Sequence, residues 1–96
     1  MNKTPKVSPM KLRNQPGYLV QTPYDDFFLE QFREMIPKRD RWFNRPRKGW
    51  WVAEEHLDVV LHLVRDAFGG AIIVVDEDGR EIIHEGDERI EQGRLL

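Results

Sequence analysis

The chain has 96 residues, a formal net charge of −2 at pH 7 and no cysteine. This length allows one domain. The lack of cysteine excludes disulfides and thiolate metal sites and suits a cytoplasmic protein. No apolar run approaches the roughly 20 residues that span a bilayer, and no apolar segment follows the first lysines as a signal peptide requires. We therefore expect one small, monomeric, cytoplasmic domain with no membrane partner.

The charge is divided unevenly along the chain. Residues 1–50 carry eleven Lys and Arg against five Asp and Glu, whereas residues 51–96 carry four against twelve. This division predicts one basic and one acidic surface if the fold keeps the two halves apart. The alternative is that both halves only form ordinary solvated faces.

Residues 1–16 are polar and basic and contain three prolines, with few apolar residues and no periodicity. This composition predicts a disordered basic arm, which can add charge to a basic surface or be inert. At the other end, residues 86–96 are charged and contain two glycines, so we expect a charged flexible tail there. A single folded domain is predicted over residues 17–85.

Helical and strand patterns alternate within this domain. A cap at Thr22 and Pro23 at the first helical position open one helix, which Pro37 ends. Gly69-Gly70 ends the second helix. The expected elements are strands at 17–21, 41–44, 50–53, 71–75 and 81–84 and helices at 22–36 and 54–68.

This order, β-α-β-β-α-β-β, predicts an α+β fold. Two helices pack most simply on one face of a mostly antiparallel sheet. The continuous apolar run at 71–75 is expected to be a strand buried on both faces. The last strand, 81–84, is expected to lie at an edge.

Residues 32–52 hold all three tryptophans and seven Lys and Arg. We expect a hairpin there, with a turn at 45–49. Alternation of side chains suggests that Trp42 and Trp50 face the helices while Phe43 and Trp51 emerge on the opposite face. Whether that opposite face is open depends on what covers it, and the tryptophans can also be ordinary core residues.

Catalytic and metal-binding patterns are weak. His56 and His62 are six residues apart on one helix and cannot share an ion. Ser8 is the single serine and lies in the basic arm. The Asp76–Gly79 segment is explained better as a hairpin turn than as a calcium loop. We therefore predict a protein that is not an enzyme and has no metal or cofactor.

Aromatic rings beside cations are typical of proteins that bind single-stranded nucleic acid, where bases stack on the rings. The prediction is a nucleic-acid-binding site in which aromatic residues stack bases and basic residues bind phosphates. The predicted site residues are Arg41, Phe43, Arg45, Arg47, Lys48 and Trp51.

Two alternatives use the same features differently. Exposed Phe43 and Trp51 can instead anchor a protein partner, which makes the domain a protein-interaction or regulatory module of possible phage origin. In the second alternative, the acidic half of the chain forms the binding surface, which imitates DNA and attracts a basic partner.

The hairpin and the helices around it resemble the HARP domain, a small module that accompanies Swi/Snf-type annealing helicases and other superfamily-two helicases. The resemblance covers about fifty residues, from Tyr18 to Gly69. It implies a compact α/β fold, engagement of forked or single-stranded DNA, and a helicase as a possible protein partner. The matching residues are Phe32, Ile36, Pro37, Arg41, Trp42, Lys48, Trp50 and Val52.

The chain departs from this family in two ways. Members usually carry small or polar residues where this chain has Phe43 and Trp51, and those extra rings favour either base stacking or a protein contact. The chain also contains no helicase motor, so the resemblance does not imply annealing activity.

Overall fold

Residues 4–84 are described by the computed structural model, which contains two α-helices, two 3₁₀ helices and one six-stranded sheet. The elements are β1 (Lys6–Pro9), β2 (Gly17–Gln21), α1 (Asp26–Met35), η1 (Lys38–Asp40), β3 (Arg41–Asn44), β4 (Gly49–Ala53), η2 (Glu54–His56), α2 (Leu57–Phe68), β5 (Ile72–Val75) and β6 (Glu81–His84). The predicted α+β class is confirmed, as is the order of elements from residue 17 onward. The tail predicted at 86–96 lies outside the described residues.

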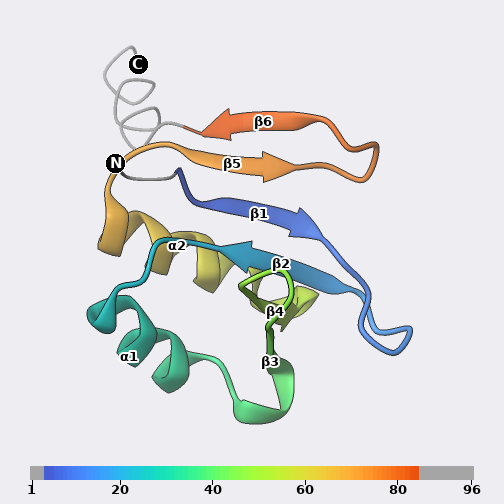
Figure 1. The fold of residues 1–96 in the computed structure, drawn as a ribbon, viewed down its shortest axis with the longest axis horizontal. Coiled ribbons are helices and arrows are strands. Elements are labelled where there is room, and N and C mark those ends of the chain that lie inside the picture. The colour runs from blue at the N-terminus through green and yellow to red at the C-terminus, as the bar shows by residue number, and fades with distance from the viewer. Residues whose placement is uncertain (1–3, 85–96) are drawn as a thin grey trace, which may run out of the picture.

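The strands lie side by side in the order β3-β4-β2-β1-β5-β6 (Figure 1). All neighbouring pairs are antiparallel except β1 and β5, which are parallel. The β3–β4 and β5–β6 hairpins therefore occupy opposite edges of one sheet. The cationic β3–β4 turn and the acidic β5–β6 turn therefore lie apart, but the two halves of the sequence are not fully separated, because Lys6 of β1 forms a 3.1 Å ion pair with Glu81 of β6.

The segment before Gly17 is ordered, and the prediction of a disordered basic arm over residues 1–16 is wrong for the described residues. β1 fits between β2 and β5, where Val7 is fully buried. The chain then reverses through Arg13 and Asn14, which have positive φ angles of 51° and 69°. A strand at residues 6–9 was not predicted, because Val7 is its single buried residue and one buried residue does not form a periodic pattern.

Helix α1 begins later than predicted. Thr22 does not cap it; the Asp25 carboxylate accepts a hydrogen bond from the backbone N–H of Phe28 at 2.8 Å. Carboxylates are strong caps because they also favour the positive end of the helix dipole. The end was predicted correctly, since Ile36 is already extended before Pro37.

Both helices pack on one face of the sheet, as predicted (Figure 1). Met35, near the end of α1, is exposed. β5 is paired on both sides, yet only Ile72 is buried, so the prediction that 71–75 is covered on both faces is wrong. The core cluster shared by the sheet and both helices consists of Val7, Val20, Phe28, Phe32, Ile36, Val52, Val60, Leu63, Val64 and Ile72, and Leu19, Trp51 and Ala53 are also buried.

Candidate nucleic-acid interface

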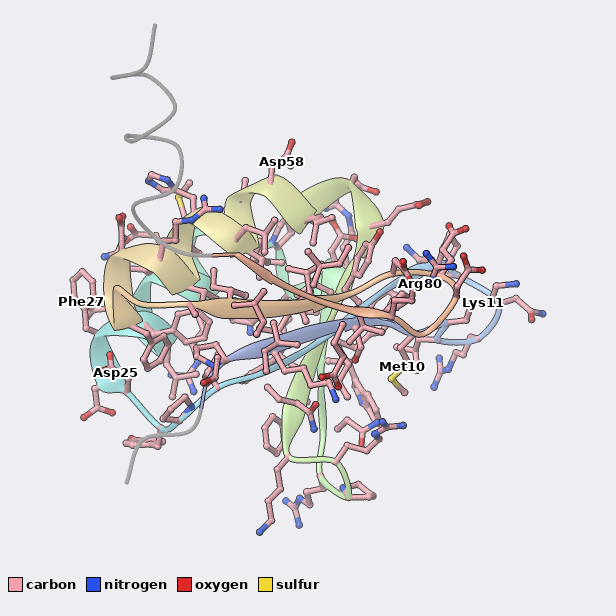
Figure 2. The ribbon with its side chains drawn as sticks, turned by 90° about the horizontal axis from the view of Figure 1, so that it is seen from above. Met10, Lys11, Asp25, Phe27, Asp58 and Arg80 are labelled. Carbon is pink, nitrogen blue, oxygen red and sulfur yellow. The ribbon has the colours of Figure 1, made fainter. Side chains whose placement is uncertain are left out.

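The tip of the β3–β4 hairpin is a turn organised by one buried side chain. Asn44 Oδ1 accepts a hydrogen bond from the Arg47 backbone N–H at 3.1 Å, and the Lys48 N–H donates to the Arg45 carbonyl at 3.1 Å. Pro46 restricts the backbone between them, and Lys48 takes a positive φ of 54°. The turn therefore holds three exposed cations on a hairpin that projects from the body of the sheet (Figure 2).

The register of the hairpin differs from the predicted one by one residue. Trp42 pairs with Trp51, and Phe43 pairs with Trp50. Paired residues share a face, so the prediction that Phe43 and Trp51 emerge together is wrong. The turn contains four residues between Asn44 and Gly49, and a shift of one residue in pairing exchanges the faces of every side chain.

Trp51 cannot stack a base, because it is a core residue with only 2% of its surface exposed. Its indole Nε1 donates a hydrogen bond to the Met10 carbonyl at 2.8 Å, so the segment predicted to be disordered contacts this ring. The ring also lies across Gly17, where an added Cβ would come within 2.5 Å of Nε1. Trp51 is therefore removed from the predicted site.

Trp42 is the exposed indole of the hairpin, although its predicted position was against the helices. It is 49% exposed and lines a pocket of about 460 Å³. The β1–β2 turn contributes Arg13 to this pocket, and η1 contributes Arg39. The two arginines come from segments far apart in sequence, so no local pattern revealed them. The full lining is Leu12, Arg13, Gln15, Arg39, Arg41, Trp42 and Trp51.

Arg41, predicted to bind phosphate, is partly occupied by the fold. Its Nε donates to the Ile36 carbonyl at 3.0 Å, where α1 has ended. Its guanidinium carbon lies 5.8 Å from the centre of the Trp50 ring, a cation–π distance. These contacts give Arg41 a structural role at the hairpin base, besides its place in the Trp42 pocket.

Phe43 lies on the helix-covered face and is 43% exposed. Its ring meets the ring of Trp50 edge-on, with centroids 5.3 Å apart. Both rings line a second pocket of about 460 Å³ between the hairpin and the start of α1. That pocket also contains Tyr24, Arg33 and Lys48, of which only Lys48 is among the site residues predicted from the sequence.

Most cations around the hairpin are free of close carboxylates. Within residues 4–84, Arg13, Arg33, Arg45, Arg47 and Lys48 form no ion pair within 4 Å. In the same range, the acidic groups of the β5–β6 turn lie at the opposite edge of the sheet. The hairpin therefore presents uncompensated positive charge, which attracts polyanions.

One group of possible metal ligands lies at the base of the hairpin. Asp40, Glu55 and His56 each offer an atom within 4.8 Å of the others. Asp40 and His56 are joined by a 2.8 Å contact between Oδ2 and Nε2, which links η1 before the hairpin to η2 after it. This contact explains the arrangement as a structural link between the two 3₁₀ helices.

Comparison of the chain with protein-family models, with curated proteins and with solved structures finds no match. The resemblance to the HARP domain therefore stays a prediction. Neither helix in residues 4–84 is long and apolar enough to cross a bilayer.

Proposed function

We propose that this chain is a non-catalytic domain that binds single-stranded nucleic acid through the projecting β3–β4 hairpin. The observation that carries the proposal is the half-exposed Trp42 indole, which stands between arginines of the β1–β2 turn and η1 and close to a cationic tip. A base stacks on Trp42, and Arg13 and Arg39 bind the phosphates beside it. Arg45, Arg47 and Lys48 continue the phosphate path over the tip.

Physical magnitudes favour this pairing of groups. Stacking one base on an aromatic side chain contributes about 1–3 kcal/mol. Each phosphate neutralised on a single strand makes the slope of log affinity against log salt concentration more negative by roughly 0.7. A site that engages three or four phosphates therefore binds with a slope of about −2 to −3.

The proposal is tested by titrating a labelled oligothymidylate of about twelve nucleotides, a length within the usual site size of such domains. Anisotropy is followed at low and at moderate salt, together with tryptophan quenching. We expect quenching from Trp42, and Trp42→Leu should weaken binding at least about fivefold. Phe27→Leu is the matched control, because Phe27 is also an exposed aromatic residue but lies on α1.

A protein partner is the competing function, and one observation favours it. The pocket beside Phe43 and Trp50 is lined largely by apolar groups, as interface anchor sites are. Trp51 no longer supports this reading, because it is buried. Binding anchored by Phe43 in a protein complex would depend little on salt, whereas nucleic-acid binding depends on it steeply. Absence of oligonucleotide binding at low salt would contradict our proposal and favour the protein partner.

A further inference from the structure

The Phe43 pocket lies on the opposite face of the sheet from the Trp42 pocket, although the two residues are adjacent in β3. Consecutive side chains of a strand point to opposite faces. The same short strand therefore gives one exposed ring to each face. The proposed function rests on Trp42 and gives no role to the exposed ring of Phe43 on the other face.

The floor of the Phe43 pocket is a rigid aromatic surface. Trp50 packs against Phe43 on one side and against Phe32 on the other, with centroids 5.3 and 5.1 Å away. Phe32 is fully buried in the core and anchors this stack. Phe43 therefore presents its exposed surface in a fixed orientation, which lowers the entropy cost of stacking a ligand on it.

The charged side chains of this pocket are two cations, Arg33 and Lys48, and one carboxylate, Asp25, so the lining has a net positive charge that favours an anionic ligand. The Asp25 carboxylate already accepts a hydrogen bond from the Phe28 N–H, and the Tyr24 hydroxyl donates to Asp26. Arg33 and Lys48 remain as the cations of the lining. An aromatic floor beside two cations suits a planar ring that carries an anionic group, which is the chemistry of a nucleotide.

Lys48 connects the two pockets. It belongs to the cationic tip and also lines the Phe43 pocket. A path of cations therefore leads from Arg13 and Arg39, over the tip, to Lys48 and Arg33.

We infer that one single strand crosses the end of the hairpin and places a nucleotide on each face, one against Trp42 and one against Phe43. This inference rests on the proposed function and adds a second nucleotide subsite to it. A strand held in this way cannot be part of a duplex at the point of crossing. The site therefore selects unpaired nucleic acid by wrapping around a protein edge.

The inference is tested with oligothymidylates of increasing length, from two to about twelve nucleotides. The native chain should show a step in affinity, of at least about fivefold, at the length that first reaches both pockets. Phe43→Leu should remove this step while leaving the affinity of the shortest strands unchanged. Trp42→Leu should weaken strands of every length.

Arg33→Gln tests the same pocket without disturbing the aromatic stack, because Arg33 is exposed on α1. It should reduce the step and lower the salt slope for long strands by about 0.7. Near-ultraviolet circular dichroism checks that Phe43→Leu keeps the packing of Trp50. Arg80→Gln, at the β5–β6 turn, is the control for charge.

The possible results separate the two ideas. If affinity rises smoothly with length, and neither Phe43→Leu nor Arg33→Gln alters it while Trp42→Leu does, the second subsite is refuted and the proposed function stands. If no strand of any length binds at low salt, the proposed function itself fails. A length step that is lost in Phe43→Leu and reduced in Arg33→Gln supports the crossing strand.

Discussion

The two hairpins at the edges of the sheet have turns that are stabilised in the same way, by a side chain that accepts backbone hydrogen bonds, but the turns carry opposite charges. In β3–β4, the Asn44 amide oxygen accepts a hydrogen bond from Arg47, and in β5–β6, the Asp76 carboxylate accepts from the N–H groups of Asp78 and Arg80. Side chains of this type commonly replace backbone groups in turns. The neutral amide lies beneath a cationic tip, whereas the carboxylate belongs to an acidic turn.

The hairpins also differ in how firmly they are attached. Trp51 of β4 is buried and bonded to the β1–β2 turn, while Ile83 of β6 is exposed. The basic hairpin is therefore braced on both of its faces, by Trp50 on the helix side and Trp51 on the other. The β3–β4 hairpin is thus the more firmly packed of the two edges, which supports the proposal that this edge binds the ligand.

The largest expected effect concerns this bracing. Trp51→Ala should lower the free energy of unfolding by about 3–5 kcal/mol, as for other buried aromatic residues. Ile83→Ala, in the other hairpin, should change it by less than about 1 kcal/mol, because the residue is exposed. Urea denaturation measures both. Equal effects would show that the two edges are braced alike.

The next largest effect concerns stability where the paired strands β2 and β4 approach each other at Gly17. A Cβ added at Gly17 would lie 2.3 Å from the Val52 carbonyl oxygen and 2.5 Å from the Trp51 ring. Gly17→Ala should therefore destabilise the fold by about 1–3 kcal/mol through overpacking. Gly70→Ala is the matched control, because its added Cβ comes no closer than 4.0 Å to other atoms. Thermal unfolding of the two variants would decide, and similar melting temperatures would argue against this close approach.

The third effect tests the charges of the two tips. Replacing Arg45, Arg47 and Lys48 together with Ala should reduce affinity for single strands at least about tenfold at moderate salt and flatten the salt slope by about 2. Neutralising Glu77 and Asp78 as Gln and Asn should raise affinity slightly, because like-charge repulsion falls. Anisotropy titrations measure both. An unchanged slope in the first variant would place the phosphates elsewhere.

The smallest effect is a pH dependence near the Phe43 pocket. The hydrogen bond from the Tyr24 hydroxyl to the Asp26 carboxylate raises the pKa of Tyr24 above its ordinary value of 10.0, and the negative charge of Asp26 adds to this rise. A raised folded-state pKa contributes stability below the unfolded-state pKa, and this contribution is lost as pH rises through the folded-state value. Because the ring is exposed, the change in stability should be small.

The titration of tyrosinate absorbance in Asp26→Asn measures this link. The phenol of Tyr24 should then ionise at lower pH than in the native chain. Identical titration curves would mean that the contact between Tyr24 and Asp26 does not form in solution.

Sequence patterns revealed the helices and most of the sheet because these elements have many periodic positions. Phe28 and Phe32 in α1, and Val60 and Val64 in α2, repeat at helical spacing and are all buried. Gly69 ends α2 with a positive φ of 68°, as its position suggested. The local sequence of a long amphipathic segment is thus sufficient to predict a helix and its buried face.

The candidate site was harder to predict because it depends on which residues of neighbouring strands are paired. The exposure of Trp42 and the burial of Trp51 follow from the number of residues in the Asn44–Gly49 turn, which local composition does not determine. The placing of Arg13 beside Trp42 depends on β1, a strand in which Val7 is the single buried residue. The cations predicted at the tip remain in the candidate site, because residues in an exposed turn stay exposed whichever residues of the two strands are paired.

The position of β1 has a consequence for how the chain folds during synthesis. β1 is synthesised before the other five described strands, yet it lies between β2 and β5, and its partner residues 73 and 74 are synthesised much later. The β2–β3–β4 part can pair while the ribosome is still translating, but β5 and β6 can join the sheet only through β1. Such distant pairing slows folding, so a protein fragment that begins at Gly17 would lack the one strand that joins the acidic edge to the basic one.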